Sequence, residues 1–99
     1  MNIEQKKDGG KIILLPEGKV DTLTAPELSE AVEGVAEDVK ELILDFSGVS
    51  YISSAGLRTL LNAHKKMVKQ GGEMKVTQVN DTVMEVFAMT GFDAMLSIG

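Results

Sequence analysis

The 99-residue chain has no cysteine and no tryptophan, only two prolines, and only four aromatic residues in every hundred. The lack of cysteine excludes a disulfide framework, thiol chemistry and a cysteine-ligated metal. No apolar run approaches the roughly 20 residues of a membrane-spanning helix. The first eight residues lack the apolar core of a signal peptide. These absences predict a soluble, cytoplasmic protein with no membrane partner.

Positive charge is also scarce, since the chain has 10 Lys and Arg residues and 15 Asp and Glu residues, which gives a net charge of −5. Nucleic-acid affinity depends on clustered basic side chains. One cluster of basic residues comprises His64, Lys65, Lys66 and Lys69. No aromatic residue accompanies this cluster for base stacking. We interpret this cluster as a solvated helix face and expect no nucleic-acid partner.

The length and the 43% hydrophobic content predict one globular domain spanning residues 1–99.

Strand patterns recur along the chain. The turn chemistry of Asp8-Gly9-Gly10 predicts a hairpin between an edge segment near Ile3 and a strand over 11–15. That strand is apolar at every position after Lys11, which is typical of burial on both faces. Because Pro16 cannot donate to a ladder, a continuation to Val20 requires a bulge or an edge there. Further strands are expected over 40–46 and 73–79, and a last edge strand within 95–98.

Three amphipathic helices separate these strands. The first starts at Thr24, which forms a capping-box pattern with Glu27. The second starts near Ser53 or Ser54 and ends at Gly71-Gly72. Its expected apolar stripe is Leu57, Leu60, Leu61, His64 and Val68.

The third helix starts at Asn80 and ends at Gly91, with Phe92 placed to touch Phe87. The resulting order, β-β-α-β-α-β-α with a terminal strand, predicts an α/β fold. We expect a mixed, mostly parallel sheet with helices packed against it.

Sites in open α/β sheets form beyond the carboxyl ends of the strands. Two polar loops, 18–24 and 47–54, meet this condition. If the strands before them are neighbours, Asp21, Thr22 and Ser54 share a surface. Ser53 and Ser54 fall where a helix exposes free backbone N–H groups, a place that favours a phosphate. The position suits a phosphorylation switch.

Structural roles remain open for the same residues. Ser54 is also an ordinary helix-start residue, and Ser53 is expected to be the N-cap. Asp21 stabilises a turn or contacts a partner, and Asp45 is expected to accept backbone N–H bonds. Gly56 is expected to allow close packing at the first helical turn.

Two further function classes find little support. A nucleophilic enzyme using Ser54 lacks the Gly-x-Ser-x-Gly elbow. The lone His64 comes ten residues later on the same helix, about 15 Å away, too far to activate the hydroxyl. A nucleotide-binding domain lacks a Walker motif. No catalytic residue, metal site or cofactor is therefore expected.

The sequence resembles the STAS domain of anti-sigma factor antagonists over nearly its whole length. The resemblance rests on residues 17–28, EGKVDTLTAPEL, on residues 44–57, LDFSGVSYISSAGL, and on residues 86–92, VFAMTGF. It implies a non-enzymatic module that binds an anti-sigma factor and so releases a sigma factor. The alternative is a STAS subunit of a stress-signalling or lipid-transport complex with another partner.

The resemblance further implies that the anti-sigma factor is a serine kinase. It would phosphorylate the residue that matches Ser54, and a metal-dependent phosphatase would reverse the modification. Many family members have aspartate where this chain has Ser53, which makes Ser53 a second candidate acceptor. The partner-binding surface expected around this corner comprises Asp21, Thr22, Ser53, Ser54, Ala55 and Gly56.

Overall fold

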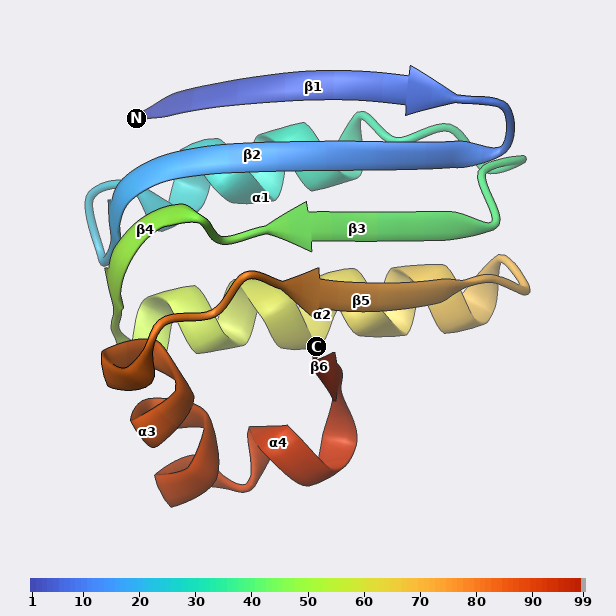
Figure 1. Ribbon diagram of the computed structural model, residues 1–99. Coiled ribbons are helices and arrows are strands. Elements are labelled where there is room, and N and C mark those ends of the chain that lie inside the picture. Colours follow the sequence, from blue (N-terminus) through green and yellow to red (C-terminus); the bar gives the residue numbers. More distant parts are fainter. Residues whose placement is uncertain (99) are drawn as a thin grey trace.

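A computed structural model describes residues 1–98 and shows one mixed sheet with the strand order β1-β2-β3-β5-β6, and β4 pairs with β2 (Figure 1). The strands are β1 (Asn2–Asp8), β2 (Lys11–Val20), β3 (Glu41–Asp45), β4 (Gly48–Ile52), β5 (Glu73–Thr77) and β6 (Ser97–Ile98). The helices are α1 (Ala25–Glu33), α2 (Ser54–Lys69), α3 (Asp81–Thr90) and α4 (Phe92–Met95). β1 and β2 are antiparallel, and the other pairs are parallel. The predicted α/β architecture is confirmed.

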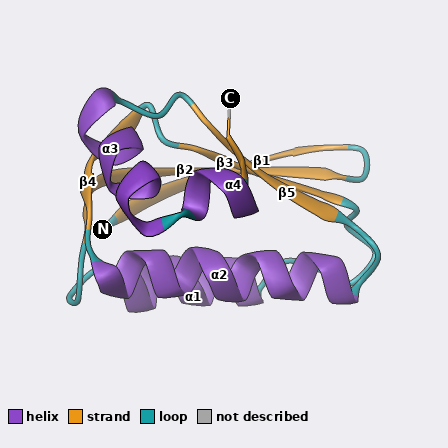
Figure 2. Cartoon of the chain, turned by 90° about the horizontal axis from the view of Figure 1, so that it is seen from below, coloured by secondary structure: helices purple, strands orange, loops and turns teal. Residues whose placement is uncertain are grey.

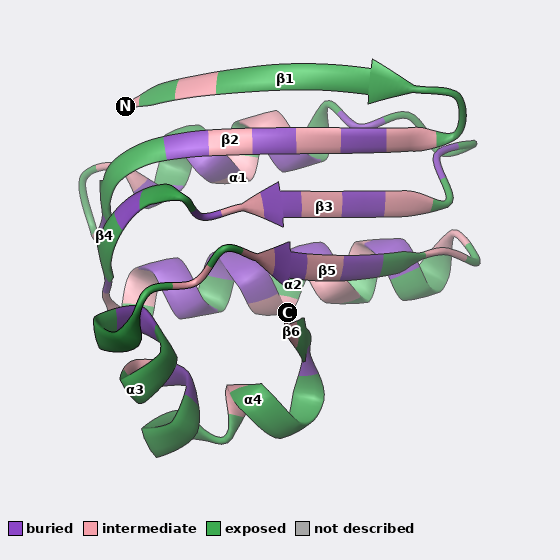
Figure 3. Cartoon of the chain, in the orientation of Figure 1, coloured by how far each residue is buried: buried purple, intermediate pink, exposed green. Residues whose placement is uncertain are grey.

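Helices α1 and α2 lie side by side against one face of the sheet, while α3 and α4 lie at its β5 side (Figures 1 and 2). The core lies between the sheet and α1 and α2. Along β2, Ile12 and Leu14 are buried, whereas Ile13 and Leu15 are only partly covered (Figure 3). The prediction that this strand is buried on both faces is wrong, because no helix of residues 1–98 covers the second face (Figure 2).

β4 is a strand within the segment 47–54, which the sequence had indicated to be a loop. β3 and β4 follow one another along the same side of β2, with Leu44 beside Leu14 and Gly48 beside Glu17. Pro16 falls between the two paired stretches, so its missing N–H interrupts neither of them. β2 continues to Val20 with a register shift after Gly18, which has a φ of 98°. No bulge lies at Pro16, where a bulge or an edge was expected: Pro16 pairs in regular register with Ile3 of β1, and the register shift lies two residues later.

The end of α2 follows the prediction. Gly71 has a φ of 76°, and its N–H donates to the carbonyl of Val68 at 3.1 Å, while Gly72 donates to Met67 at 2.8 Å. This is a Schellman ending. The predicted apolar stripe is wrong at Val68, whose side chain is 58% exposed, because Met67 occupies the buried position instead.

The C-terminal segment is also close to expectation. Gly91 adopts the left-handed conformation with a φ of 81°, and the rings of Phe87 and Phe92 stack with centroids 6.5 Å apart. The short helix α4 was not predicted. It includes Met95, so the terminal strand is limited to β6.

Candidate functional site

The loop after β2 and the start of α2 leave the same edge of the sheet. Val20 at the end of β2 pairs with Ile52 at the end of β4. The N–H of Ser53 donates to the carbonyl of Val20 at 2.9 Å. The expectation that the two polar loops share a surface is therefore confirmed, although β4 rather than β3 provides the second strand end.

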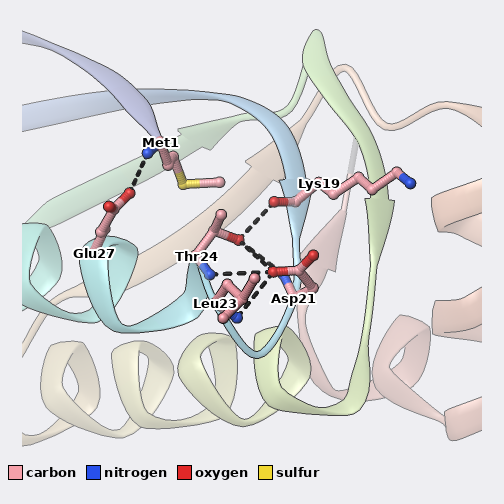
Figure 4. A network of polar contacts seen from close by, with 6 residues as sticks. All are labelled: Met1, Lys19, Asp21, Leu23, Thr24 and Glu27. Atoms are coloured by element: carbon pink, nitrogen blue, oxygen red, sulfur yellow. Dashed lines mark hydrogen bonds and ion pairs between the residues drawn. The ribbon is translucent and has the colours of Figure 1, made fainter.

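Residues 21–24 form a hydrogen-bonded turn, here called the Asp21 turn (Figure 4). The Asp21 carboxylate accepts from the N–H groups of Leu23 at 3.0 Å and Thr24 at 3.1 Å. The Thr24 hydroxyl accepts from the Asp21 N–H at 2.9 Å and donates to the carbonyl of Lys19 at 2.6 Å. Asp21 is thus a turn stabiliser, and its turn presents Thr22 and Leu23 to solvent.

The predicted capping box at the start of α1 is not formed. Thr24 has helical dihedral angles, and its side chain makes no cap hydrogen bond, because its hydroxyl is occupied within the Asp21 turn. Glu27, the expected partner in the box, instead pairs with the N-terminal amine of Met1 (Figure 4). The helix starts where predicted, but through other contacts.

The Asp21 turn also changes the acidity of its carboxyl group. The backbone N–H of Thr24 makes the largest contribution to holding the pKa of Asp21 below the ordinary value of 3.8. Desolvation is the second-largest contribution and opposes the effect, while the N–H of Leu23, the Thr24 hydroxyl and the charge of Lys19 add to it. Asp21 is consequently an anion throughout the physiological pH range.

The two serines at the strand-to-helix corner have different environments. Ser53 occupies the N-cap position, yet its side chain makes no cap hydrogen bond, and its Oγ is buried with no partner among residues 1–98. Ser54 is the first residue of α2 and is exposed. Of the two serines, Ser54 is therefore the one exposed to solvent.

The first turn of α2 is packed directly against the sheet at Gly56. A Cβ on Gly56 would lie 2.6 Å from the Ile52 side chain and 2.8 Å from the Val20 carbonyl oxygen. This confirms the expected close approach. The N–H of Leu57 makes the first hydrogen bond within the helix, to the carbonyl of Ser53 at 2.9 Å. The N–H groups of residues 54–56 therefore have no partner within the helix.

A groove of about 270 Å³ runs between α1 and α2 beside this corner. We call it the α1–α2 groove; it is lined by Thr22, Ala25, Pro26, Ser29, Ala55, Arg58, Thr59 and Asn62. It unites two of the predicted site residues, Thr22 and Ala55. Arg58, Thr59 and Asn62 were missed, although they follow Ala55 by three, four and seven residues and so lie on one helical face.

Other candidate residues have structural surroundings. The Asp45 carboxylate accepts from the Ser47 N–H at 2.9 Å, as expected for a strand end. His64 is partly buried on α2, and its Nδ1 has no hydrogen-bond partner among residues 1–98. Within that range there is no group of three acidic or histidine side chains able to hold a metal ion. None of its helices is long and apolar enough to span a membrane.

The structure is thus that of a small α/β domain with an exposed serine and a hydrogen-bonded acidic turn at one edge of its sheet. The STAS-domain family model matches residues 2–99, and the chain belongs to this family. It is 29% identical to the anti-sigma-B factor antagonist of Bacillus subtilis over 98 residues, which cover 99% of this chain and 90% of the relative. It is 31% identical to the anti-sigma-B factor antagonist of Listeria monocytogenes over 104 residues, with the same coverage of both chains.

A solved structure supports the same relationship. The anti-sigma factor antagonist from Mycobacterium paratuberculosis superposes with a TM-score of 0.87 at 26% identity, over 98% of this chain and 83% of that one. The family indicated by the sequence is therefore confirmed.

Proposed function

We propose that this chain is an anti-sigma factor antagonist, a cytoplasmic binding module that sequesters an anti-sigma factor and so releases a sigma factor. Membership of the STAS family supports this function, as do relatives of that name aligned over almost the whole chain. We further propose that one domain, residues 1–99, carries it. The relatives are named as regulators, which agrees with a binding role rather than an enzymatic one.

The observation that carries the proposal further is the exposure of Ser54 beside a buried Ser53 hydroxyl. We propose that the anti-sigma factor is also a serine kinase that transfers the γ-phosphoryl group of ATP to Ser54 Oγ. A metal-dependent phosphatase removes it. Ser53 is not the acceptor, because its oxygen is enclosed by the protein.

The remaining surface residues divide into those that contact the partner and those that hold the surface in place. Thr22, Ser54 and Ala55 reach the surface beside the α1–α2 groove and are proposed to contact the anti-sigma factor. The same proposed surface includes Asp21, Ser53 and Gly56, which hold it in place. Asp21 forms the turn, Ser53 lies at the corner, and Gly56 lets α2 pack closely against the sheet. The α1–α2 groove is thus part of the proposed interface.

Phosphorylation switches this interface by local electrostatics. A phosphate adds about −1.5 to −2 charge, and a helix N-terminus stabilises it by only about 0.3–1 kcal/mol. The fold therefore needs no rearrangement. A misplaced charge at a protein–protein interface costs several kcal/mol, and about 3 kcal/mol lowers affinity roughly a hundredfold.

The test uses the cognate anti-sigma kinase with ATP. We expect one phosphate on the wild-type chain, located on Ser54 by peptide mass spectrometry, and the same result for Ser53→Ala. Ser54→Ala should accept none and keep its affinity for the anti-sigma factor, while Ser54→Asp should bind more weakly. Phosphate found on Ser53 alone would overturn the site, and equal affinities of Ser54→Ala and Ser54→Asp in calorimetry would overturn the switch.

A further inference from the structure

Arg58 lies one helical turn after Ser54 on α2, and both side chains are exposed. The first turn of α2 contains no acidic residue. Within residues 1–98, every ion pair of the structure involves other residues, so the Arg58 guanidinium is uncommitted. Among the described residues, Arg58 is also the only cationic side chain that lines the α1–α2 groove.

The helix geometry directs this guanidinium towards Ser54. Residues four apart on a helix are neighbours, with Cβ atoms about 5–6 Å apart. Helical side chains lean towards the N-terminus, so Arg58 covers the surface over the preceding turn. An anion placed four residues before a cation is the favourable order for an ion pair. A guanidinium also binds phosphate through two parallel hydrogen bonds.

We propose that a phosphate on Ser54 is bound within the same chain by Arg58. This inference rests on the proposed phosphorylation of Ser54. Binding would change the surface in two ways at once. The local charge of the Ser54–Arg58 pair changes from +1 to between about −0.5 and −1 at neutral pH, and the guanidinium is withdrawn from any acidic group of the anti-sigma factor. Phosphorylation thereby removes an attractive contact as well as adding a repulsive charge.

The other charged groups near the corner are already engaged or lie on other elements. The Asp21 carboxylate is held by two N–H groups of its own turn, and Glu27 pairs with the N-terminal amine. Lys19, near the end of β2, is the second cation, and its side chain extends away from the Asp21 turn (Figure 4). It is on a strand rather than on α2, so its contribution can be separated by substitution.

The experiment places phosphoserine at position 54 during translation, which makes it independent of any kinase. A ³¹P NMR titration then gives the second pKa of the phosphate in the full chain. A bound guanidinium favours the dianion and lowers this pKa. We expect Arg58→Gln to raise this pKa by roughly 0.15–0.4, from the strength of helical ion pairs at this spacing, and Arg58→Lys to raise it less.

Matched controls remove the same charge elsewhere. Lys65→Gln, later on the exposed part of α2, should leave the phosphate pKa within about 0.1 of wild type, because solvent and salt screen distant charges. Thermal unfolding of each variant shows that the fold is kept. A pKa that does not respond to Arg58→Gln, or responds equally to Lys65→Gln, would overturn the proposal. A larger response to Lys19→Gln would assign the contact to Lys19 instead and also overturn it.

The same samples separate this inference from the function on which it rests. If the phosphate pKa depends on Arg58 but phosphoserine at 54 leaves binding of the anti-sigma factor unchanged, the ion pair is supported and the proposed switch is contradicted. If phosphoserine at 54 abolishes binding of the anti-sigma factor but the phosphate pKa does not change in Arg58→Gln, the switch is supported and the ion pair is contradicted.

Discussion

Gly56 packs against Val20 so closely that no side chain fits between them: a Cβ on Gly56 would lie 2.8 Å from the Val20 carbonyl oxygen. That oxygen already accepts the N–H of Ser53 at 2.9 Å. The end of β2 and the start of α2 are therefore joined by a hydrogen bond and by direct contact. This junction fixes the position of Ser54 relative to the Asp21 turn.

Substitution of Gly56 by alanine should destabilise the protein by about 1–3 kcal/mol, because the added methyl group overpacks the junction. Gly34→Ala is the matched control. A Cβ there would make only ordinary contacts, the nearest at 3.5 Å from the Ala31 carbonyl oxygen, and the residue has a negative φ of −74°. Urea unfolding of the two variants checks the contrast. Equal stabilities would show that the helix start adjusts without cost.

The Asp21 turn predicts a pH dependence whose sign follows from the lowered pKa of Asp21. The native state favours the carboxylate. Its contribution to stability is therefore present above the unfolded pKa of about 3.9 and is lost as the pH falls towards the lower folded value. A carboxyl-carbon NMR titration should show a midpoint for Asp21 below 3.8.

Thr24→Val tests the role of the hydroxyl in that turn. The variant keeps the Thr24 N–H but loses the hydroxyl that bonds Asp21 and Lys19. We expect the free energy of unfolding to fall by about 1–2 kcal/mol and the pKa of Asp21 to rise towards its ordinary value. Thr22→Val, which changes an exposed side chain of the same type, should change neither quantity. An unchanged Asp21 titration in Thr24→Val would contradict the assigned network.

Ser53→Ala should leave the protein as stable as wild type or more stable. Removing an N-cap serine ordinarily costs about 1 kcal/mol, but the Ser53 Oγ makes no cap hydrogen bond and is buried without a partner among residues 1–98. Removing an unsatisfied buried hydroxyl relieves its desolvation cost. Thermal unfolding measures the difference, and a loss of 1 kcal/mol would show that Ser53 caps α2 in solution.

Asn80→Ala is the contrasting variant at the start of α3. The Asn80 side chain accepts the Val83 N–H at 2.8 Å and donates to the Val49 carbonyl at 3.0 Å. We expect a loss of about 1–2 kcal/mol when both bonds are removed. The same calorimetric scan thus distinguishes a helix start held by its side chain from one held by backbone packing.

Local signals in the sequence predicted most of the fold. Glycines at 71 and 91 end their helices in the left-handed conformation because no other residue type reaches it as easily. Strand β4 could not be predicted from such local signals. Its segment, with exposed Ser50 and Tyr51 and buried Val49, has no regular apolar alternation, and it pairs with β2 beyond the stretch that β3 occupies.

The sequence predicted that the candidate site residues lie at one edge of the sheet, but not the contacts that they make. The sequence placed Asp21, Thr22 and Ser54 at one edge, and the pairing of Val20 with Ile52 brings them there. Whether Thr24 caps a helix or closes a turn depends on the carbonyl of Lys19, whose position is fixed only in the folded chain. The α1–α2 groove depends on how two helices pack and has no local signature.

Leu23 offers the sharpest test of the proposed interface. Its side chain is 85% exposed, on a turn whose backbone is fixed by the Asp21 carboxylate. A large apolar side chain held out by a rigid turn binds with little loss of conformational entropy. We expect Leu23→Ser to keep the stability within about 0.5 kcal/mol and to weaken binding of the anti-sigma factor at least roughly tenfold, the effect of losing about 1.4 kcal/mol.

Val68→Ser is the matched control for Leu23→Ser. Val68 is also a surface aliphatic residue, 58% exposed, but it lies near the opposite end of α2 from Ser54. We expect it to change neither stability nor affinity by more than about 0.5 kcal/mol. Calorimetry of both variants with the same anti-sigma factor makes the comparison. If Val68→Ser weakens binding and Leu23→Ser does not, the partner approaches the other end of the helices, and the interface around Ser54 is wrong.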